Sequence, residues 1–67
     1  MSPIDARGMR CPWPALRLAR AMREAAEATI VADDPAAAGE FRALADQQGW
    51  ALEAVDTAIG PGHRACR

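Results

Sequence analysis

Alanine makes up half of the apolar residues of this chain, and the scarcity of large apolar side chains limits the folds that it can form. Of the 67 residues, 34 are hydrophobic, and 17 of these are alanine. A chain of this length lies near the lower size limit for folding on one hydrophobic core. We therefore expect a thin, closely packed core and no enclosed ligand cavity. The large apolar residues available to the core are Ile4, Trp13, Leu16, Leu18, Met22, Ile30, Val31, Phe41, Leu44, Trp50, Leu52, Val55 and Ile59.

A proline after a glycine turn marks the first helix. Residues 3–6 predict a short strand, which the glycine turn follows. Pro12 suits the first position of a helix, where its missing N–H is not needed, and Cys11 is then predicted to be the N-cap. The helix is expected to run to about Glu27. Its buried stripe is predicted to contain Ala15, Leu18, Ala19, Met22, Ala25 and Ala26.

The next part of the chain repeats this pattern of a strand and a helix that begins with proline. Residues 29–32 are apolar and rich in β-branched side chains, which predicts a buried strand. Asp34 is predicted to cap a helix over residues 35–48, and Gly49 to end it. The inner stripe of this helix is expected to contain Phe41, Leu44, Ala45 and either Ala37 or Ala38.

The last part of the chain predicts a hairpin and completes the fold class. Strands are expected over residues 50–56 and 63–67, joined by a turn at residues 59–62. In the resulting β-α-β-α-β-β order, each crossover predicts parallel pairing of the strands that it joins, and both helices should lie on one face of the sheet. We therefore expect one domain over residues 1–67, an α/β (α+β) two-layer sandwich with a small mixed four-stranded sheet.

Charge and cysteine content restrict the possible functions. The formal net charge of −1 argues against a general nucleic-acid binder, although five of the eight arginines lie in the first 23 residues, around Cys11. No run approaches the ~18 apolar residues of a membrane span, and the N-terminus lacks the features of a signal peptide, so a cytoplasmic protein is expected. Cys11 and Cys66 match no metal-ligand spacing and no disulfide framework. We therefore expect free thiols, no metal and no cofactor.

Cys11, in the motif Cys-Pro-Trp-Pro, is the candidate catalytic residue. A cysteine at a helix N-cap faces the positive end of the helix dipole, which lowers the pKa of the thiol. Arg10 and Arg7 would add positive potential. Pro12 and Pro14 have no N–H, so they would leave the sulfur lightly hydrogen-bonded and open to attack. The alternative is a small, buried and inert cysteine at a strand-to-helix corner, and spacing alone does not decide between the two.

The segment from Asp5 to Pro14 resembles the signature of the TusA/SirA family of small sulfur-carrier proteins, in which a glycine turn precedes Cys-Pro-x-Pro. Ala-Asp-Asp-Pro at residues 32–35 and the later Gly49 also fall at the family's spacing, and the resemblance covers nearly the whole chain. It implies a fold like that of the C-terminal domain of translation initiation factor 3. It also implies that Cys11 accepts sulfane sulfur as a persulfide.

The resemblance implies partners as well. A persulfide relay takes sulfur from a donor protein, such as a cysteine desulfurase or a rhodanese-like protein. It passes the sulfur to an acceptor protein in tRNA thiolation, molybdenum-cofactor synthesis or other sulfur metabolism. Such a sulfurtransferase belongs to a relay rather than acting as a stand-alone enzyme, with no membrane and no direct nucleic-acid contact. The alternative is a non-catalytic interaction or regulatory module of the same fold.

Trp13 and nearby arginines form the candidate partner surface. Helical phase places Trp13, Arg17 and Arg20 opposite the buried stripe, and Arg7 adds charge close to Cys11. An exposed tryptophan flanked by arginines suits partner binding. The alternative is a Trp13 side chain folded back onto the strand-to-helix corner.

The second predicted helix departs from the family pattern. The family usually has Asp-Ile-Pro at the positions where this chain has Glu40-Phe41-Arg42. Because partners contact the variable surface, such a departure bears on partner choice and leaves Cys11 untouched.

Four polar or thiol residues have simpler interpretations than catalysis. Asp33 and Asp34 are predicted to cap a helix rather than to bind metal or act in acid–base chemistry. His63 is predicted to be a solvated residue of a glycine-rich turn. A resolving role for Cys66, in a redox protein that pairs it with Cys11, requires Cα atoms within about 7 Å.

Overall fold

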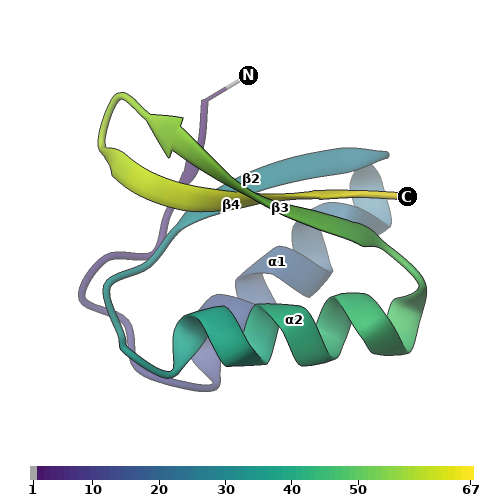
Figure 1. Ribbon diagram of the computed structural model, residues 1–67, viewed down its shortest axis with the longest axis horizontal. Helices are drawn as coiled ribbons and strands as arrows, with labels where there is room; N and C mark the ends of the chain where they lie inside the picture. The colour runs from purple at the N-terminus through teal and green to yellow at the C-terminus, as the bar shows by residue number, and fades with distance from the viewer. Residues whose placement is uncertain (1) are drawn as a thin grey trace.

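Two helices and four strands follow one another in the predicted β-α-β-α-β-β order (Figure 1). The computed structural model describes residues 2–67. The elements are β1 (Ile4–Asp5), α1 (Trp13–Glu24), β2 (Glu27–Val31), α2 (Ala37–Gln48), β3 (Ala51–Thr57) and β4 (Gly60–Cys66).

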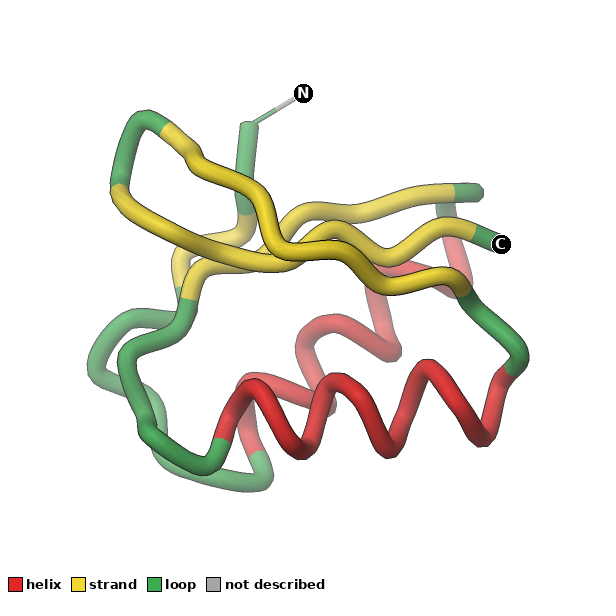
Figure 2. The backbone as a smooth tube through the Cα atoms, in the orientation of Figure 1, coloured by secondary structure: helices red, strands yellow, loops and turns green. Residues whose placement is uncertain are grey.

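The helices form one layer and the sheet forms the other. Both helices lie on the same face of the sheet, and the opposite face is left open (Figures 1 and 2). The strands are hydrogen-bonded in the order β1-β2-β4-β3, with β1 parallel to β2 and with β4 antiparallel to both of its neighbours. The predicted two-layer sandwich with a mixed sheet is therefore confirmed.

One prediction about strand pairing is wrong. The crossover from β2 through α2 to β3 joins strands that run in the same direction but do not pair, because β4 lies between them. The turn at Ala58 and Ile59 has only two residues and folds β4 directly back along β3. The other edge of β4 then pairs with β2. Ala65 of β4 consequently lies opposite both Ala28 of β2 and Leu52 of β3.

Strand β4 also begins earlier than the sequence predicts. A turn is expected at residues 59–62, but Pro61 and Gly62 lie within the strand and pair with β3. Proline is tolerated here because the pairing of β4 with β2 extends only to His63, so Pro61 has a neighbouring strand on one side alone.

Helix α1 starts one residue later than predicted, which removes Cys11 from the N-cap position. The N-cap is Pro12, and no side chain caps the helix by a hydrogen bond. The N–H of Trp13 donates to the carbonyl oxygen of Arg10 at 2.9 Å, across a turn that contains the cis Cys11–Pro12 peptide bond. The prediction that Cys11 caps the helix is therefore wrong.

The end of α1 shows sheet formation outweighing local helix preference. The sequence predicts a helix to about Glu27, but α1 ends at Glu24 and Ala25 is extended. The alanine-rich segment favours helix by propensity. However, the pairing of β2 with β4 begins at Glu27, and Ala28 is buried in the core. Burial and strand pairing together outweigh the propensity.

The sequence predicts that the second helix begins at Pro35, but α2 begins two residues later, at Ala37. The N–H of Ala37 donates to the carbonyl oxygen of Asp34 at 2.9 Å, and the N–H of Ala36 donates to the Asp34 carboxylate at 3.0 Å. A separate turn therefore precedes the helix. At the other end Gly49 is left-handed, with φ of 76°, and ends the helix as predicted.

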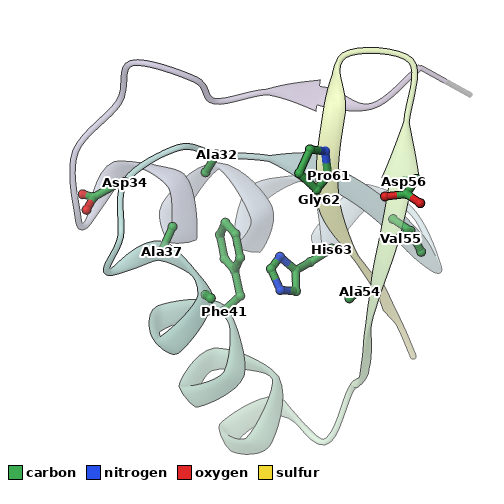
Figure 3. Close-up of a pocket in the computed structure, with 11 residues that line it drawn as sticks. Ala32, Asp34, Ala37, Phe41, Ala54, Val55, Asp56, Pro61, Gly62 and His63 are labelled. Carbon is green, nitrogen blue, oxygen red and sulfur yellow. The ribbon is translucent and has the colours of Figure 1, made fainter.

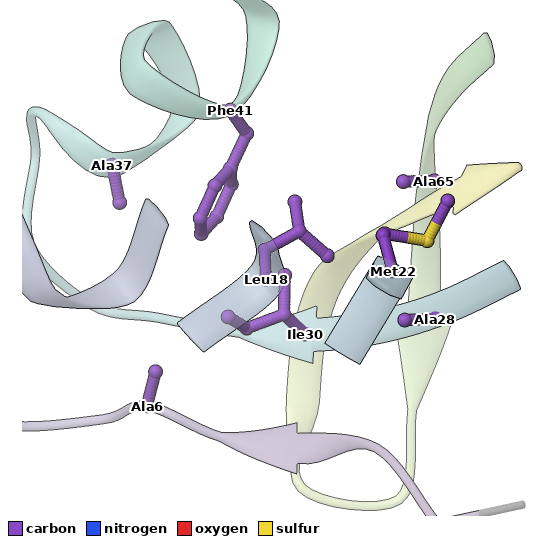
Figure 4. Packing of buried hydrophobic residues seen from close by; sticks show 8 residues of the cluster. All are labelled: Ala6, Leu18, Met22, Ala28, Ile30, Ala37, Phe41 and Ala65. Atoms are coloured by element: carbon purple, nitrogen blue, oxygen red, sulfur yellow. The ribbon is translucent and has the colours of Figure 1, made fainter. Parts of the chain in front are cut away.

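The core is as rich in alanine as the sequence predicts. Among residues 2–67, five of the ten buried apolar residues are alanine. Leu18, Met22, Ile30 and Phe41 are the largest apolar side chains among those most fully buried, and they lie between the helices and the sheet (Figure 4). Small side chains around these four let both helices approach the sheet closely.

Helix α1 buries part of the predicted stripe. Leu18 and Met22 are buried, Ala15 and Ala19 are half-buried, and the predicted members Ala25 and Ala26 lie beyond the end of the helix. Pro14, Leu18 and Met22 are buried at four-residue intervals. Leu16, which its size favours as a core residue, is 52% exposed, because it lies on the helix face of Trp13. Neither α1 nor α2, which are the helices of the described residues, has both the length and the apolar content needed to cross a membrane.

Gly62 is a position in the sheet where a side chain would not fit. A Cβ atom there would lie 2.5 Å from the carbonyl oxygen of Ile30 and 2.9 Å from a methyl group of Val31. We expect Gly62→Ala to lower the free energy of unfolding by about 1–3 kcal/mol, because β2 and β4 would have to move apart. Chemical denaturation followed by circular dichroism measures this change.

Gly39→Ala is the matched control, because nothing lies within 4 Å of a Cβ atom at Gly39 of α2. This substitution is expected to raise the free energy of unfolding by up to about 1 kcal/mol, since alanine favours helix over glycine. Equal stability of Gly62→Ala and the wild-type protein would contradict the close approach of β4 to β2.

Candidate functional site

Cys11 lies in the loop between β1 and α1, and it is exposed. The loop turns at Gly8, whose φ of 83° favours glycine, and the N–H of Met9 donates to the carbonyl oxygen of Ala6. Ala6 is fully buried, and Met9 packs partly against the core. The core thus holds one end of the loop, and Cys11 is presented at the surface. The alternative of a buried cysteine is wrong.

The carboxylates of Asp33 and Asp34, just after β2, hold this loop in place. Asp33 accepts a hydrogen bond from the N–H of Gly8 at 2.9 Å, and Asp34 accepts one from the N–H of Cys11 at 2.7 Å. Hydrogen bonds from the N–H groups of Ala36 and then of Cys11 lower the pKa of the Asp34 carboxyl group. The predicted helix-capping role is thus corrected: the pair caps the Cys11 loop and the turn before α2.

The sulfur of Cys11 contacts a carboxylate rather than a cation. Its Sγ atom donates a hydrogen bond at 3.2 Å to Oε1 of Glu40, in the first turn of α2. This hydrogen bond is the largest cause of a raised pKa of the Cys11 thiol, followed by desolvation and by the negative charges of Glu40 and Asp34. The expectation that the surroundings lower this pKa is therefore wrong.

The backbone explains why the helix dipole does not lower the pKa of Cys11. The residue lies one position outside the cap, and Pro12 and Pro14 have no N–H to offer the sulfur. The N–H between these two prolines donates to the carbonyl oxygen of Arg10. The charge of Arg10 is not among the causes that shift the thiol pKa, but it contributes to the lowered pKa of Asp34.

Arg7 is tied to its own strand. Its guanidinium group donates to both carboxylate oxygens of Asp5 at 2.9 Å, and at 3.5 Å to the carbonyl oxygen of Ile59 in the β3–β4 turn. The hydrogen bond from Arg7 lowers the pKa of Asp5 to about 2. Arg7 therefore braces the end of β1 against the hairpin, and its predicted contribution to a partner surface stays a prediction.

Trp13 opens an exposed strip along α1. Its side chain is 60% exposed, Leu16 is 52% exposed, and Arg17 and Arg20 are exposed on the same side of the helix. The alternative in which Trp13 folds back onto the strand-to-helix corner is wrong. From the sequence, Leu16 is expected in the core because it is apolar. Its position three residues after Trp13 nevertheless places it on the exposed side of the helix. We call these four residues the Trp13 face.

An open groove of about 460 Å³ lies between α2 and the β3–β4 hairpin (Figure 3). Its lining includes Asp34, Phe41, Asp56 and His63, but not Cys11. The rings of Phe41 and His63 meet edge to face, with their centroids 5.6 Å apart. The prediction that His63 is a solvated turn residue is wrong, since it is half-buried within β4.

Cys66 lies at the opposite end of the sheet from Cys11. It pairs with Glu27 at the start of β2, whereas Asp34, beyond the end of β2, binds the Cys11 loop. The four steps of β2 alone cover about 13 Å at ~3.3 Å per residue, which exceeds the reach of a disulfide. Both cysteines are free.

Among residues 2–67, no three His, Cys, Asp or Glu side chains are placed to hold a metal ion.

Glu40 is the residue of this site that the sequence interpretation missed. In that interpretation it is considered only as part of Glu40-Phe41-Arg42, a segment that differs from the Asp-Ile-Pro expected from the resemblance. A comparison of whole segments hides the fact that Glu40, like the expected aspartate, supplies a carboxylate. In the structure this carboxylate contacts the sulfur of Cys11, although the two residues are 29 positions apart. The negative charge at position 40 is the one sequence signal that could have indicated the contact.

Removing the Asp34 carboxylate is expected to loosen the Cys11 loop. In Asp34→Ala the amide hydrogens of Cys11 and Ala36 should exchange with solvent about tenfold faster, because each loses an ordinary hydrogen bond. Hydrogen exchange followed by NMR resolves the individual amides. Asp33→Ala is the matched control and should accelerate exchange at Gly8 instead. An unchanged exchange rate at Cys11 in Asp34→Ala would contradict the proposed tether.

Two comparisons relate this geometry to known proteins. The family model described as "Sulfurtransferase TusA" matches residues 3–65. The crystal structure of a SirA-like protein from Desulfitobacterium hafniense is similar, with a TM-score of 0.77 and 26% sequence identity. The alignment covers 98% of this chain and 95% of that chain.

The family match runs from β1 to the penultimate residue of β4, so it includes the Cys11 loop and the helix that carries Glu40. The similar crystal structure extends over the same elements. This chain therefore belongs to the TusA sulfurtransferase family.

Proposed function

We propose that this protein is a sulfur carrier that accepts a sulfane sulfur on Cys11 as a persulfide and passes it to an acceptor protein. One observation supports this most: Cys11, in the Cys-Pro-x-Pro motif, is exposed at the surface of a chain that matches the TusA family over residues 3–65. A sulfur that is handed from one protein to another has to be reachable by both.

The chemistry requires only thiols and a donor persulfide. The deprotonated sulfur of Cys11 attacks the outer sulfur of the donor, the sulfur–sulfur bond of the donor breaks, and the donor leaves as a thiolate that takes up a proton. Cys11 then carries the persulfide. An acceptor thiolate repeats the attack on the outer sulfur and restores the Cys11 thiol. Each transfer exchanges one sulfur–sulfur bond for another, so no external oxidant or reductant is needed.

The Trp13 face suits the docking of such partners. It joins two exposed apolar side chains, Trp13 and Leu16, to the positive charges of Arg17 and Arg20, and it begins two residues after Cys11. Large aromatic side chains and arginines dominate the binding energy of many interfaces. A donor protein, such as a cysteine desulfurase or a rhodanese-like protein, and an acceptor protein would each present an acidic surface with an apolar pocket.

The proposal predicts that sulfur is loaded on Cys11. After incubation with a cysteine desulfurase and cysteine, or with a rhodanese and thiosulfate, intact-mass spectrometry should show one added sulfur atom per chain. Cys11→Ser should abolish this adduct, because the nucleophile is absent, while Cys66→Ser should retain it. A folded protein that no such donor loads, or an adduct located on Cys66, would refute the proposal.

A non-catalytic interaction module is the second candidate, and the raised pKa of the Cys11 thiol favours it. A thiol that is protonated at neutral pH is a poor nucleophile in the free protein. The Cys11→Ser variant distinguishes the two functions, because a binding module would keep its partner and its effect, whereas a carrier would lose sulfur transfer.

The Trp13 face is predicted to act in docking and not in chemistry. Leu16→Ala and Arg17→Glu should each slow sulfur uptake from the donor protein that loads the wild-type chain, and Trp13→Ala should slow it about tenfold or more. Stopped-flow or quenched mass spectrometry measures the uptake rates. Uptake from a small-molecule persulfide should be unchanged in Leu16→Ala and Arg17→Glu, because neither residue touches the sulfur.

Arg42→Glu is the matched control, since it reverses an exposed charge on α2, outside the Trp13 face. It should leave uptake from the donor protein unchanged. If the Arg17 and Arg42 variants were slowed equally, net charge rather than this face would determine the rate.

A further inference from the structure

The charged groups that contact Cys11 are carboxylates. Glu40 of α2 accepts the hydrogen bond from Sγ at 3.2 Å, and Asp34 accepts the bond from the backbone N–H of the same residue at 2.7 Å. The positive charge of Arg10, the adjacent residue of the loop, contributes to the lowered pKa of Asp34. The sulfur thus faces one carboxylate directly and a second through its own backbone.

Such an arrangement stabilises the thiol and disfavours the thiolate. The carboxylate of Glu40 can accept a hydrogen bond from S–H, but it repels the negative charge that remains when the proton leaves. The raised pKa of the Cys11 thiol is the expected result. Glu40 is half-buried and Cys11 is exposed, so both groups can be approached by a partner.

We propose that Glu40 is a positioning residue that keeps the Cys11 sulfur protonated in the free protein, so that sulfur uptake favours a donor with a positive charge beside its persulfide. This inference rests on the proposed function and adds the chemistry of the preferred donor. A cation brought next to Glu40 pairs with the carboxylate and removes the acceptor of the thiol hydrogen bond. The thiol proton then passes to solvent, and the sulfur becomes nucleophilic only where a donor is present.

The transfer itself remains balanced. The Cys11 thiolate forms a bond to the outer sulfur of the donor persulfide, and the bond between the two donor sulfurs breaks. The donor sulfur leaves as a thiolate and takes a proton from solvent, which replaces the proton that Cys11 released. The cation stays with the donor and is not consumed.

The first test measures the protonation of Cys11 directly. In a Cys66→Ser background, the rate of alkylation by iodoacetamide as a function of pH reports the thiolate of Cys11 alone. Glu40→Gln should shift this profile to lower pH and raise the alkylation rate at pH 7 about threefold or more, because a larger fraction of the thiol is then ionised. Glu40→Asp should retain a profile nearer to that of the wild type.

Asp46→Asn is the matched control, because it removes an exposed carboxylate from the same helix. Its alkylation profile should superimpose on that of the wild type. An unshifted profile for Glu40→Gln, or an equal shift for Asp46→Asn, would overturn the assignment of Glu40.

The second test measures charge preference during sulfur uptake. Two small persulfides of similar length serve as donors, the cationic persulfide of cysteamine and the anionic persulfide of 3-mercaptopropionate. The wild-type protein should load faster from the cationic donor, and Glu40→Gln should lose most of this preference, mainly by loading faster from the anionic donor. Equal preference in the wild type and in Glu40→Gln would overturn the inference.

The two tests separate this inference from the proposed function. If neither persulfide nor any donor protein loads Cys11, the sulfur-carrier proposal fails, while the alkylation profile still reports whether Glu40 holds the thiol protonated. If Cys11 loads normally but Glu40→Gln changes neither profile nor preference, the carrier function stands and the role of Glu40 is refuted.

Discussion

Two adjacent carboxylates just after β2 connect the Cys11 loop to the turn before α2. Asp33 binds the backbone of Gly8, and Asp34 binds the backbone of Cys11 and of the turn before α2. These bonds fasten the first crossover loop to the second, although the loops are more than 20 residues apart in sequence. The position of Cys11 relative to α2, and hence its contact with Glu40, depends on them.

The hydrogen bonds of Asp33 and Asp34 also influence the protonation of the sulfur, because they place Cys11 beside Glu40. A sulfur carrier of the kind proposed has to expose its sulfur to two partners, yet an exposed thiolate would also react with oxidants and with other thiols. Here the thiol is exposed, but its pKa is raised by the hydrogen bond to Glu40. The thiol can therefore be exposed without being reactive. Its reactivity can depend on the charged groups that a partner places beside it.

Much of the fold was predictable because local signals agreed with the tertiary structure. The glycine that ends α2, the helix begun near Pro12 and the exposed side of Trp13 all follow from backbone geometry and helical period. The fold class also followed from the order of the elements. The position of β4 did not, because its sequence of small residues and proline resembles a turn and only pairing on both sides makes it a strand.

The sequence pointed to Cys11, which the structure places at the surface, but it did not predict the charges around the sulfur. A displacement of the helix start by one residue took Cys11 off the cap, and this removed the basis for a lowered pKa. Glu40 could not be placed beside the sulfur by spacing, because the contact arises from the packing of α2 and from the hydrogen bonds of Asp34. The first failure concerns the local geometry of one turn, and the second concerns a contact between residues 29 positions apart, which no local pattern encodes.

The place of β4 has a consequence for the order in which the molecule can assemble. β4 follows both β2 and β3 along the chain, yet it lies between them in the sheet. While the ribosome is still making residues 60–66, β2 and β3 lack their common neighbour, and each leaves an edge unpaired. The sheet can therefore close only after β4 has been synthesised. Until then the nascent chain carries open edges that favour aggregation or the binding of a chaperone.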